Sequence, residues 1–364
     1  MLYKFLYQLR DLFFGFNVFH YITFRAVLAA VSSFLFTVIF TPTIINKLSN
    51  LGIYQYIRDD SISAPLYQLH KNKKGTPTMG GIIILMAIII STFCWADVSN
   101  KFIQLALFSV VWLGVLGFAD DYLKLVKKHS SGLTIPMKLI GQSVLGLIIG
   151  LGLYFDKSIS TTLDVPFLKN LIVNLGVFYV FFVMLVIVAS SNAVNITDGL
   201  DGLAIGCVAI AAITYAGFSY IAGHINFSQY LNITYIPQAG ELSVFCASIV
   251  GASLGFLWFN CFPANIFMGD TGSLALGGAI GLVAIFIKKE LLLILVGGIF
   301  VVEALSVLLQ IILYRYSGGK RLFLIAPLHH HFEIKGWEEP KVTVRLWLIA
   351  VILALLSLAT LKLR

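Results

Sequence analysis

The chain has 364 residues, of which 59% are hydrophobic and only 12% are charged, and its formal net charge is +8. Soluble domains carry about 25% charged residues, so this composition excludes an ordinary soluble enzyme. A positive charge can indicate nucleic-acid binding, but the placement of lysine and arginine in a few loops explains it here. We therefore expect a membrane protein with no nucleic-acid partner.

Long apolar stretches recur along the chain, and each is close to the ~20 residues that cross a bilayer as a helix. They cover residues 26–46, 80–97, 103–119, 137–154, 171–189, 202–222, 243–259, 272–287, 291–313 and 343–361. The eighth is the weakest because it is rich in glycine and small residues. The pattern predicts an all-α integral membrane protein of about ten transmembrane helices, with residues 1–364 forming a single polytopic domain.

The loops after the first, third and ninth stretches contain most of the lysine and arginine residues. Basic loops usually face the cytoplasm, so we expect these loops on that side. An even number of spans then places both termini on the periplasmic side. The aromatic segment Met1–Tyr21 resembles an interfacial segment that precedes the first span.

Asp120 and Asp121 directly follow the apolar stretch 103–119. The C-terminal end of a helix carries partial negative charge, and two adjacent carboxylates repel each other. A helix cap therefore does not explain this pair. A cation must compensate it: the nearby lysines, of which Lys124 is the first, a metal ion, or both.

Polar residues gather in the loops that follow the odd-numbered spans, which must lie on one side. The clusters are Lys73–Gly81, Asp120–Tyr122, Asn192–Leu203, Phe267–Ser273 and Ala326–Glu333. The loops on the opposite side, such as Asp156–Lys169 and His224–Glu241, contain no comparable density. Five clusters on one side predict one composite site, made of cytoplasmic loops and helix ends.

Several aspartates in these clusters also suit a purely structural role. Asp198, Asp201 and Asp270 each stand near the start of an apolar stretch, where a carboxylate favours the helix dipole or caps the helix. However, Asn195, Asp198 and Asp201 are spaced three apart, and a helical turn would place them on one edge. The glycines after Asp198 and Asp201 would let a ligand approach the backbone closely.

The basic stretch 71–74 would, alone, be explained as a topology anchor. The turn Gly75–Gly81 beside it is stiff and exposes backbone amides, so it suits holding Lys74 against a phosphate. Lys138 and Glu303 are charges within the membrane or at its edge, and each needs a partner or a cavity.

His329, His330 and His331 are consecutive, so their side chains project in different directions. Three ligands to one metal ion are therefore not expected from them. Hydrogen bonds to a phosphate, a nucleotide or an orienting carboxylate are the roles that we expect.

Carboxylates from several helix ends, together with lysines and histidines, suit a magnesium-dependent reaction at a diphosphate. Mg²⁺ takes one or two carboxylates and leaves its other positions for water and phosphate oxygens. An enzyme of this type would join a soluble activated substrate to a lipid acceptor. An ion-coupled transporter is the alternative from another class, but its charges would lie near mid-membrane and not at helix ends.

Five segments together resemble the phospho-N-acetylmuramoyl-pentapeptide-transferase family, within the polyprenyl-phosphate N-acetylhexosamine-1-phosphate transferases. They are Lys74–Gly81, Asp120–Tyr122, Asn192–Leu203, Phe267–Asp270 and Ala326–Glu333, and the resemblance runs nearly end to end. It implies transfer of phospho-MurNAc-pentapeptide from UDP-MurNAc-pentapeptide to undecaprenyl phosphate at the bacterial inner membrane, with Mg²⁺ as cofactor. The products would be lipid I and UMP, and a homodimer would fit the family.

The resemblance also implies roles for individual residues. Asp270 would hold Mg²⁺, with Asp121 close by and Asp120 as the base that acts on the lipid phosphate. His329 and His330 fall in the family's histidine motif and complete the catalytic candidates. The positions expected to bind substrate are Lys74, Lys138, Asn192, Asn195, Asp198, Asp201, Phe267 and His331, with Phe267 stacked on uracil.

One segment departs from the family pattern, because Arg58–Asn72 is longer than the usual linker before Lys74. The nearest rival function is that of a sister enzyme, which transfers another UDP-linked N-acetylhexosamine phosphate to a polyprenyl phosphate. Direct attack by the lipid phosphate and a covalent aspartyl intermediate both fit these residues.

Overall fold

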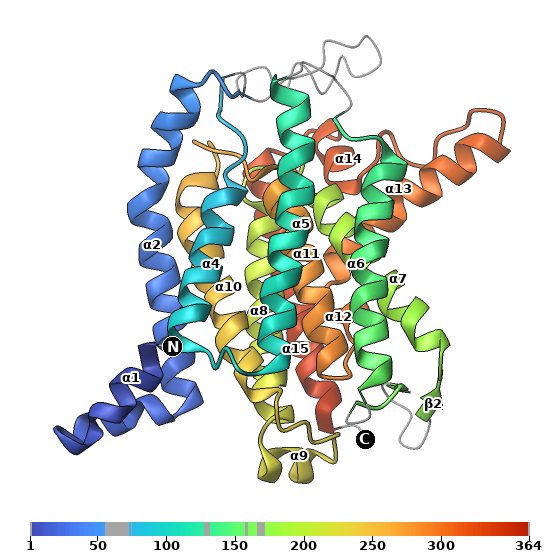
Figure 1. Ribbon diagram of the computed structural model, residues 1–364. Coiled ribbons are helices and arrows are strands. Elements are labelled where there is room, and N and C mark those ends of the chain that lie inside the picture. Colours follow the sequence, from blue (N-terminus) through green and yellow to red (C-terminus); the bar gives the residue numbers. More distant parts are fainter. Residues whose placement is uncertain are drawn as a thin grey trace.

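A computed structural model describes residues 2–54, 73, 75–126, 132–156, 159–165 and 172–362, and this part of the chain is almost entirely helical (Figure 1). The α-helices are α1 (Leu2–Gln8), α2 (Ile22–Asn50), α4 (Gly81–Trp95), α5 (Lys101–Val126), α6 (Ile135–Phe155), α7 (Phe178–Thr197), α8 (Leu203–Ala222), α9 (Ile225–Leu231), α10 (Gly240–Asn260), α11 (Gly269–Phe286), α12 (Leu293–Val296), α13 (Gly298–Tyr316), α14 (Leu328–Ile334) and α15 (Glu339–Ala359). Short 3₁₀ helices cover Leu9–Asp11, Phe14–His20 and Thr360–Lys362. Strands β1 (Thr162–Asp164) and β2 (Ile172–Asn174) pair antiparallel, with Leu163 opposite Val173.

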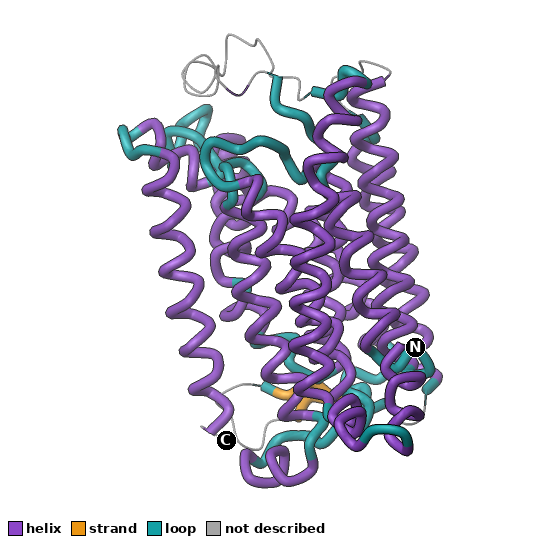
Figure 2. Tube along the Cα trace, turned by 90° about the vertical axis from the view of Figure 1, so that its left-hand side faces the viewer, coloured by secondary structure: helices purple, strands orange, loops and turns teal. Residues whose placement is uncertain are grey.

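Nine of the described helices are long and apolar enough to cross a membrane, and the 15-residue apolar helix α4 packs among them. These ten helices match the ten predicted stretches, so the all-α multi-pass architecture is confirmed. Figure 1 shows both termini at the same end of the bundle, as an even number of crossings requires. Figure 2 shows the paired strands at that same end.

Helix α11, which the sequence marked as the weakest span, lies at the centre of the bundle. It packs against α4, α5, α7 and α8, and every residue from Thr271 to Phe286 is buried. Its small residues allow neighbouring backbones to approach closely, which is how helices associate inside membranes. The same residues lower its hydropathy, so its weak signal reflects close packing.

Two helices end later than their apolar stretches do. Helix α5 continues past Ala119 to Val126, so Asp120 and Asp121 lie within its last two turns and not at its end. Helix α7 begins at Phe178, after β2, and continues to Thr197. Asn192 and Asn195 therefore belong to a helix, not to a loop. Hydropathy marks the point at which the side chains become polar. The helix itself ends later, because its backbone hydrogen bonds continue through the first polar residues.

Candidate active site at the start of α11

A close contact between α5 and α11 brings three aspartates together. A Cβ atom at Gly117 would lie 2.2 Å from the carbonyl oxygen of Asp270, so a side chain at this position would push the helices apart. Asp120 and Asp121 follow Gly117 by about one turn of α5. Glycine at position 117 thus allows their carboxylates to reach the first turn of α11.

One carboxylate oxygen from each of Asp120, Asp121 and Asp270 lies within 4.8 Å of the other two. Asp120 and Asp121 are buried, and Asp270 is half-buried. Like charges so close together repel each other strongly, above all where little water screens them. The cluster therefore requires cations, as the sequence predicted for its first two members.

Two lysines supply part of that charge. The ammonium group of Lys124 lies 2.5 Å from Asp120 and 3.0 Å from Asp270. The ammonium group of Lys138, on α6, lies 2.9 Å from Asp120 and 2.7 Å from Asp270. Asp120 and Asp270 share the two ammonium groups, and Asp121 adds a third carboxylate without a lysine partner, so these five side chains keep one negative charge in excess. Hard oxygen ligands that converge with excess negative charge fit a divalent cation.

Asp121 has partners that separate it from the other two aspartates. Its carboxylate accepts hydrogen bonds from the backbone N–H groups of Asp270 (3.1 Å) and Thr271 (2.9 Å) and from the Thr271 hydroxyl (2.7 Å). A side chain of α5 therefore caps the N-terminus of α11. Asp121 orients Asp270, whose own carboxylate stays directed at the lysines.

Asn195 joins this cluster from the last turn of α7. Its side-chain amide donates to Asp270 Oδ1 at 2.9 Å and to the Ser273 hydroxyl at 2.8 Å. The amide of Asn192 instead donates to Gln142 on α6 at 2.7 Å. Asn195 thus contacts the acid cluster directly, whereas Asn192 ties α7 to α6 nearby.

Asp198 and Asp201 do not share a helical edge with Asn195, because α7 ends at Thr197 and α8 begins at Leu203. Burial, followed by the negative charge of Asp270, raises the pKa of Asp198 to about 8. Asp201 turns away into a second cluster. The three-residue spacing failed as a predictor because the helix stops inside it.

The second cluster is centred on Lys73. Its ammonium group lies 2.6 Å from Asp201 and 2.5 Å from Glu339, at the start of α15. Asp201 also accepts the backbone N–H of Ala264 at 3.0 Å. The Lys73 ammonium group lies 6.0 Å from the ring centroid of Phe267. This cluster ties together three loops around a half-buried aromatic ring.

The Gly75–Gly81 turn runs beside Phe267. Phe267 donates its backbone N–H to Pro77 at 2.9 Å, and Gly80 donates to the carbonyl oxygen of Phe267 at 2.8 Å. The turn is therefore fixed against the segment that leads into Asp270. Lys74 and the long segment Arg58–Asn72 lie outside the described residues.

The three histidines have three different partners. His329 is fully buried, and its Nδ1 atom lies 3.2 Å from Glu303. His330 Nδ1 lies 2.7 Å from Glu333, and His331 Nδ1 accepts the backbone N–H of Leu324 at 3.1 Å. Desolvation and the charge of Lys335 lower the pKa of His331. The partner that the sequence required for Glu303 is His329.

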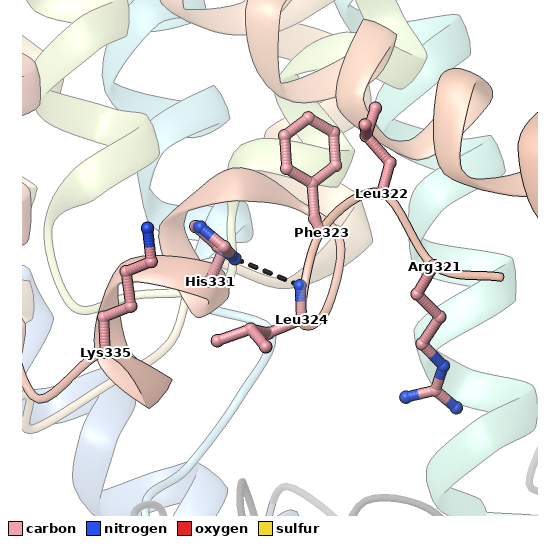
Figure 3. A pocket seen from close by; sticks show the side chains of 6 residues that line it. All are labelled: Arg321, Leu322, Phe323, Leu324, His331 and Lys335. Carbon is pink, nitrogen blue, oxygen red and sulfur yellow. Dashed lines mark hydrogen bonds between the residues drawn. The ribbon is translucent and has the colours of Figure 1, made fainter.

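His331 also borders a pocket of about 370 Å³ beside α14 (Figure 3). The pocket is lined by Arg321, Leu322, Phe323, Leu324, His331 and Lys335. The apolar side chains of Leu322, Phe323 and Leu324 line it together with the cationic side chains of Arg321 and Lys335. Of its lining residues, only His331 belongs to the predicted substrate-binding set.

The sequence analysis did not identify Glu339 as a site residue. It considered Lys124 only as a cation that could neutralise Asp120 and Asp121. Glu339 stands at the start of the last span, on the same side as the five clusters, so loop parity was the signal that pointed to it. Lys124 lies one helical turn after Asp120, and that spacing alone brings the two side chains together.

Sequence comparisons with known proteins point to the same part of the chain as this cluster of aspartates. The family model of glycosyl transferase family 4 matches residues 103–288, which contain all three clustered aspartates. The chain is thus a membrane-embedded transferase of that broad class. A narrower pattern, phospho-N-acetylmuramoyl-pentapeptide-transferase signature 1, matches residues 73–85.

Full-length relatives narrow the assignment further. Proteins named phospho-N-acetylmuramoyl-pentapeptide-transferase from Thermodesulfovibrio yellowstonii and Citrifermentans bemidjiense are each 52% identical to this chain. One from Desulforapulum autotrophicum is 49% identical. In all three comparisons the match covers 100% of both proteins. The chain belongs to the phospho-N-acetylmuramoyl-pentapeptide-transferase family.

Proposed function

We propose that this protein transfers phospho-MurNAc-pentapeptide from UDP-MurNAc-pentapeptide to undecaprenyl phosphate, giving lipid I and UMP. The observation that carries the proposal is the convergence of Asp120, Asp121 and Asp270 with two lysines at one end of a membrane bundle. The names of the relatives favour this donor over another UDP-linked N-acetylhexosamine, which was the nearest alternative.

The acid cluster is the proposed site of Mg²⁺, with Asp270 as its main ligand. Bound there, the ion would neutralise charge that develops on the pyrophosphate. Asp120 is the proposed base, since its carboxylate lies between Lys124 and Lys138 and both ammonium groups suit contacts with phosphate oxygens. Asp121 holds the first turn of α11 and so fixes Asp270.

The donor nucleotide is proposed to bind beside Phe267, with its ring stacked on uracil. Asn195 and Asp198 lie on the acid-cluster side of that region, and Lys74 is assigned to it by the resemblance. Asp201 is proposed to act through Lys73, because its carboxylate is already bound to that ammonium group. His331 and Asn192 complete the proposed substrate-binding surface, and Lys138 is proposed to contact the phosphates. His329 and His330 remain proposed members of the catalytic site through the family's histidine motif.

The positive-inside rule supports a cytoplasmic position for this site, with both termini periplasmic, in a bacterial inner membrane. A homodimer is the assembly that the resemblance implies. The lipid acceptor would then reach the site from the bilayer while the UDP substrate arrives from the cytoplasm.

The test is an assay of purified protein in detergent, with Mg²⁺ and undecaprenyl phosphate. UDP-MurNAc-pentapeptide should release UMP and form lipid I, and UDP-GlcNAc should give no product. Product from UDP-GlcNAc alone would refute the assignment. Release of UMP without lipid acceptor, in an amount equal to the enzyme, would identify a covalent intermediate instead of direct attack.

A further inference from the structure

Glu303 and His329 form a buried carboxylate–imidazole pair, and the proposed reaction gives Glu303 no role. Glu303 is 1% exposed on α13, and His329 is 0% exposed at the start of α14. Glu303 Oε2 accepts the backbone N–H of His329 at 3.3 Å and lies 3.2 Å from its Nδ1 atom. Among the described residues, His329 is the one ion-pair partner of this carboxylate. Because a buried carboxylate is costly without a partner, the pair has few alternative arrangements.

The carboxylate determines where the imidazole ring points. Glu303 accepts the backbone N–H of His329, and its carboxylate lies 3.2 Å from Nδ1, so attraction to the carboxylate holds the ring in place although Nδ1 makes no hydrogen bond of its own. The opposite nitrogen, Nε2, then faces Gly199. It is buried and has no hydrogen-bond partner within the described part of the chain. The ring therefore acts through packing against the turn that contains Gly199.

Gly199 is a glycine because of this ring. A Cβ atom at position 199 would lie 2.3 Å from His329 Nε2, and its next two nearest atoms also belong to His329. The sequence had suggested that a ligand approaches the backbone here, but the histidine fills that space. Further along the turn, Glu339 accepts the backbone N–H of Asp201 at 2.7 Å, and Asn260 accepts that of Gly202 at 3.1 Å. The ring thus supports the half of the turn that carries Asp198.

We propose that Glu303 is a positioning residue of the donor site. Glu303 fixes the His329 ring, and the ring sets the position of Asp198 and Gly199 between α7 and α8. The inference rests on the proposed function, since it takes Asp198 as a residue on the nucleotide side. Glu303, a charged residue on a membrane-spanning helix, thus acts in binding of the soluble substrate and has no role in binding of the lipid.

The first test is Glu303→Gln, which keeps the size of the side chain and an acceptor oxygen but removes the charge. The KM for UDP-MurNAc-pentapeptide should rise about tenfold or more, a scale typical of groups that orient a binding residue. The KM for undecaprenyl phosphate should not change. The matched control is Glu290→Gln, the same substitution at a glutamate buried to 4% exposure near the opposite end of α11. It should leave both KM values within about twofold, because Glu290 lies far from the donor turn along α11.

An unchanged donor KM in Glu303→Gln, or an equal rise for both substrates, would overturn the proposal. Inactivity of the wild-type protein with UDP-MurNAc-pentapeptide would instead refute the proposed function. The two failures are therefore distinguishable from the same set of assays.

The second test is Gly199→Ala, which stays informative if Glu303→Gln does not fold. Its new methyl group overlaps His329, so the donor KM should rise while the acceptor KM stays constant. Gly217→Ala is the control, since a Cβ there has nothing within 4 Å. Where both variants fold, the combined Glu303→Gln and Gly199→Ala change should raise the donor KM by less than the product of the single effects, because both disturb one contact. A donor KM unchanged by Gly199→Ala, or a fully multiplicative effect, would contradict the proposal.

Discussion

The two ends of helix α11 both bury charged side chains, but they arrange them differently. At its start, the carboxylates of Asp120 and Asp270 share the ammonium groups of Lys124 and Lys138, and Asp121 lies against them. Among the described side chains negative charge is in excess there, and one oxygen of each aspartate lies within 4.8 Å of the others.

Past its other end, the charged side chains that the structure describes are equal in number of each sign, and the two carboxylates contact different neighbours. Lys289 lies 3.1 Å from Asp164 on β1. The Tyr179 hydroxyl donates to Glu290 at 2.8 Å, and Lys288 donates to that hydroxyl at 2.6 Å. Among the described side chains two lysines lie beside two carboxylates, and these contacts hold the strand pair and α7 onto the bundle.

The comparison shows that burial of charge does not by itself define a site. Balanced charges with separate partners fix the fold, whereas unequal charges that share partners leave capacity for a ligand. The first arrangement predicts effects on stability, and the second predicts effects on catalysis. The following substitutions test that division.

The largest effect is expected from Asp120→Asn. Loss of the base should lower kcat about 10³-fold, because the amide cannot accept a proton from the lipid phosphate. The Tm should change little, since Lys124 and Lys138 keep Asp270 as a partner. UMP release and thermal unfolding in detergent measure the two quantities. A variant with near wild-type turnover would remove Asp120 from the mechanism.

Lys138→Met should give a smaller loss, about 10²-fold in kcat, because one of two phosphate-binding cations is gone. The same change increases the excess negative charge, so the protein should half-saturate at a lower Mg²⁺ concentration. The measurement is the rate as a function of Mg²⁺. Weaker Mg²⁺ binding in this variant would contradict the charge count at the start of α11.

Asp121→Asn should affect both stability and rate, because Asp121 caps α11 and orients Asp270. Loss of a charged cap costs about 1 kcal/mol, so the Tm should fall by a few degrees. We expect kcat to fall about tenfold, which is less than for Asp120→Asn, from the misplacement of Asp270. An undisturbed Tm together with complete inactivity would show that Asp121 is itself a catalytic group.

The smallest effect on the reaction is expected at the balanced end. Burial raises the pKa of Glu290 from its ordinary value of 4.5 to about 7, so its stabilising contribution is greatest in acid and is lost as pH rises through 7. Burial likewise lowers the pKa of Lys288 to about 8. Glu290→Gln should therefore gain stability relative to wild type as pH rises from about 4.5 to about 7, by at most about 3 kcal/mol. A Tm difference that is constant with pH would show that Glu290 does not titrate there.

Hydropathy and loop parity predicted the bundle and the side on which the polar clusters gather. They also identified Asp120 and Asp121 as carboxylates in need of a cation. They did not predict that Gly117 lets α11 pack closely against α5, because that contact joins helices distant in sequence. They grouped Asp198 and Asp201 by spacing, yet the end of α7 sends the two carboxylates to different clusters.

Partners across helices were the least predictable part of the site. Glu303 was recognised as a charge that needs a partner, but its partner His329 is 26 residues away on another helix. Lys288 and Lys289 are adjacent in the sequence, yet they are both buried and bind different partners, the Tyr179 hydroxyl and Asp164. Local sequence shows that a charge is present, while only the packing of the bundle shows what neutralises it.

Titration of the transfer rate with Mg²⁺, in wild type and in Asp270→Ala, is the most direct test of the site at the start of α11. The wild-type rate should be lost in EDTA and should rise to saturation as Mg²⁺ is restored. Asp270→Ala should fold, because Lys124 and Lys138 still pair with Asp120, and should stay inactive at every Mg²⁺ concentration. Full wild-type turnover in EDTA, or near wild-type turnover in Asp270→Ala, would contradict the assignment of these aspartates as the magnesium site of a phosphoryl transferase.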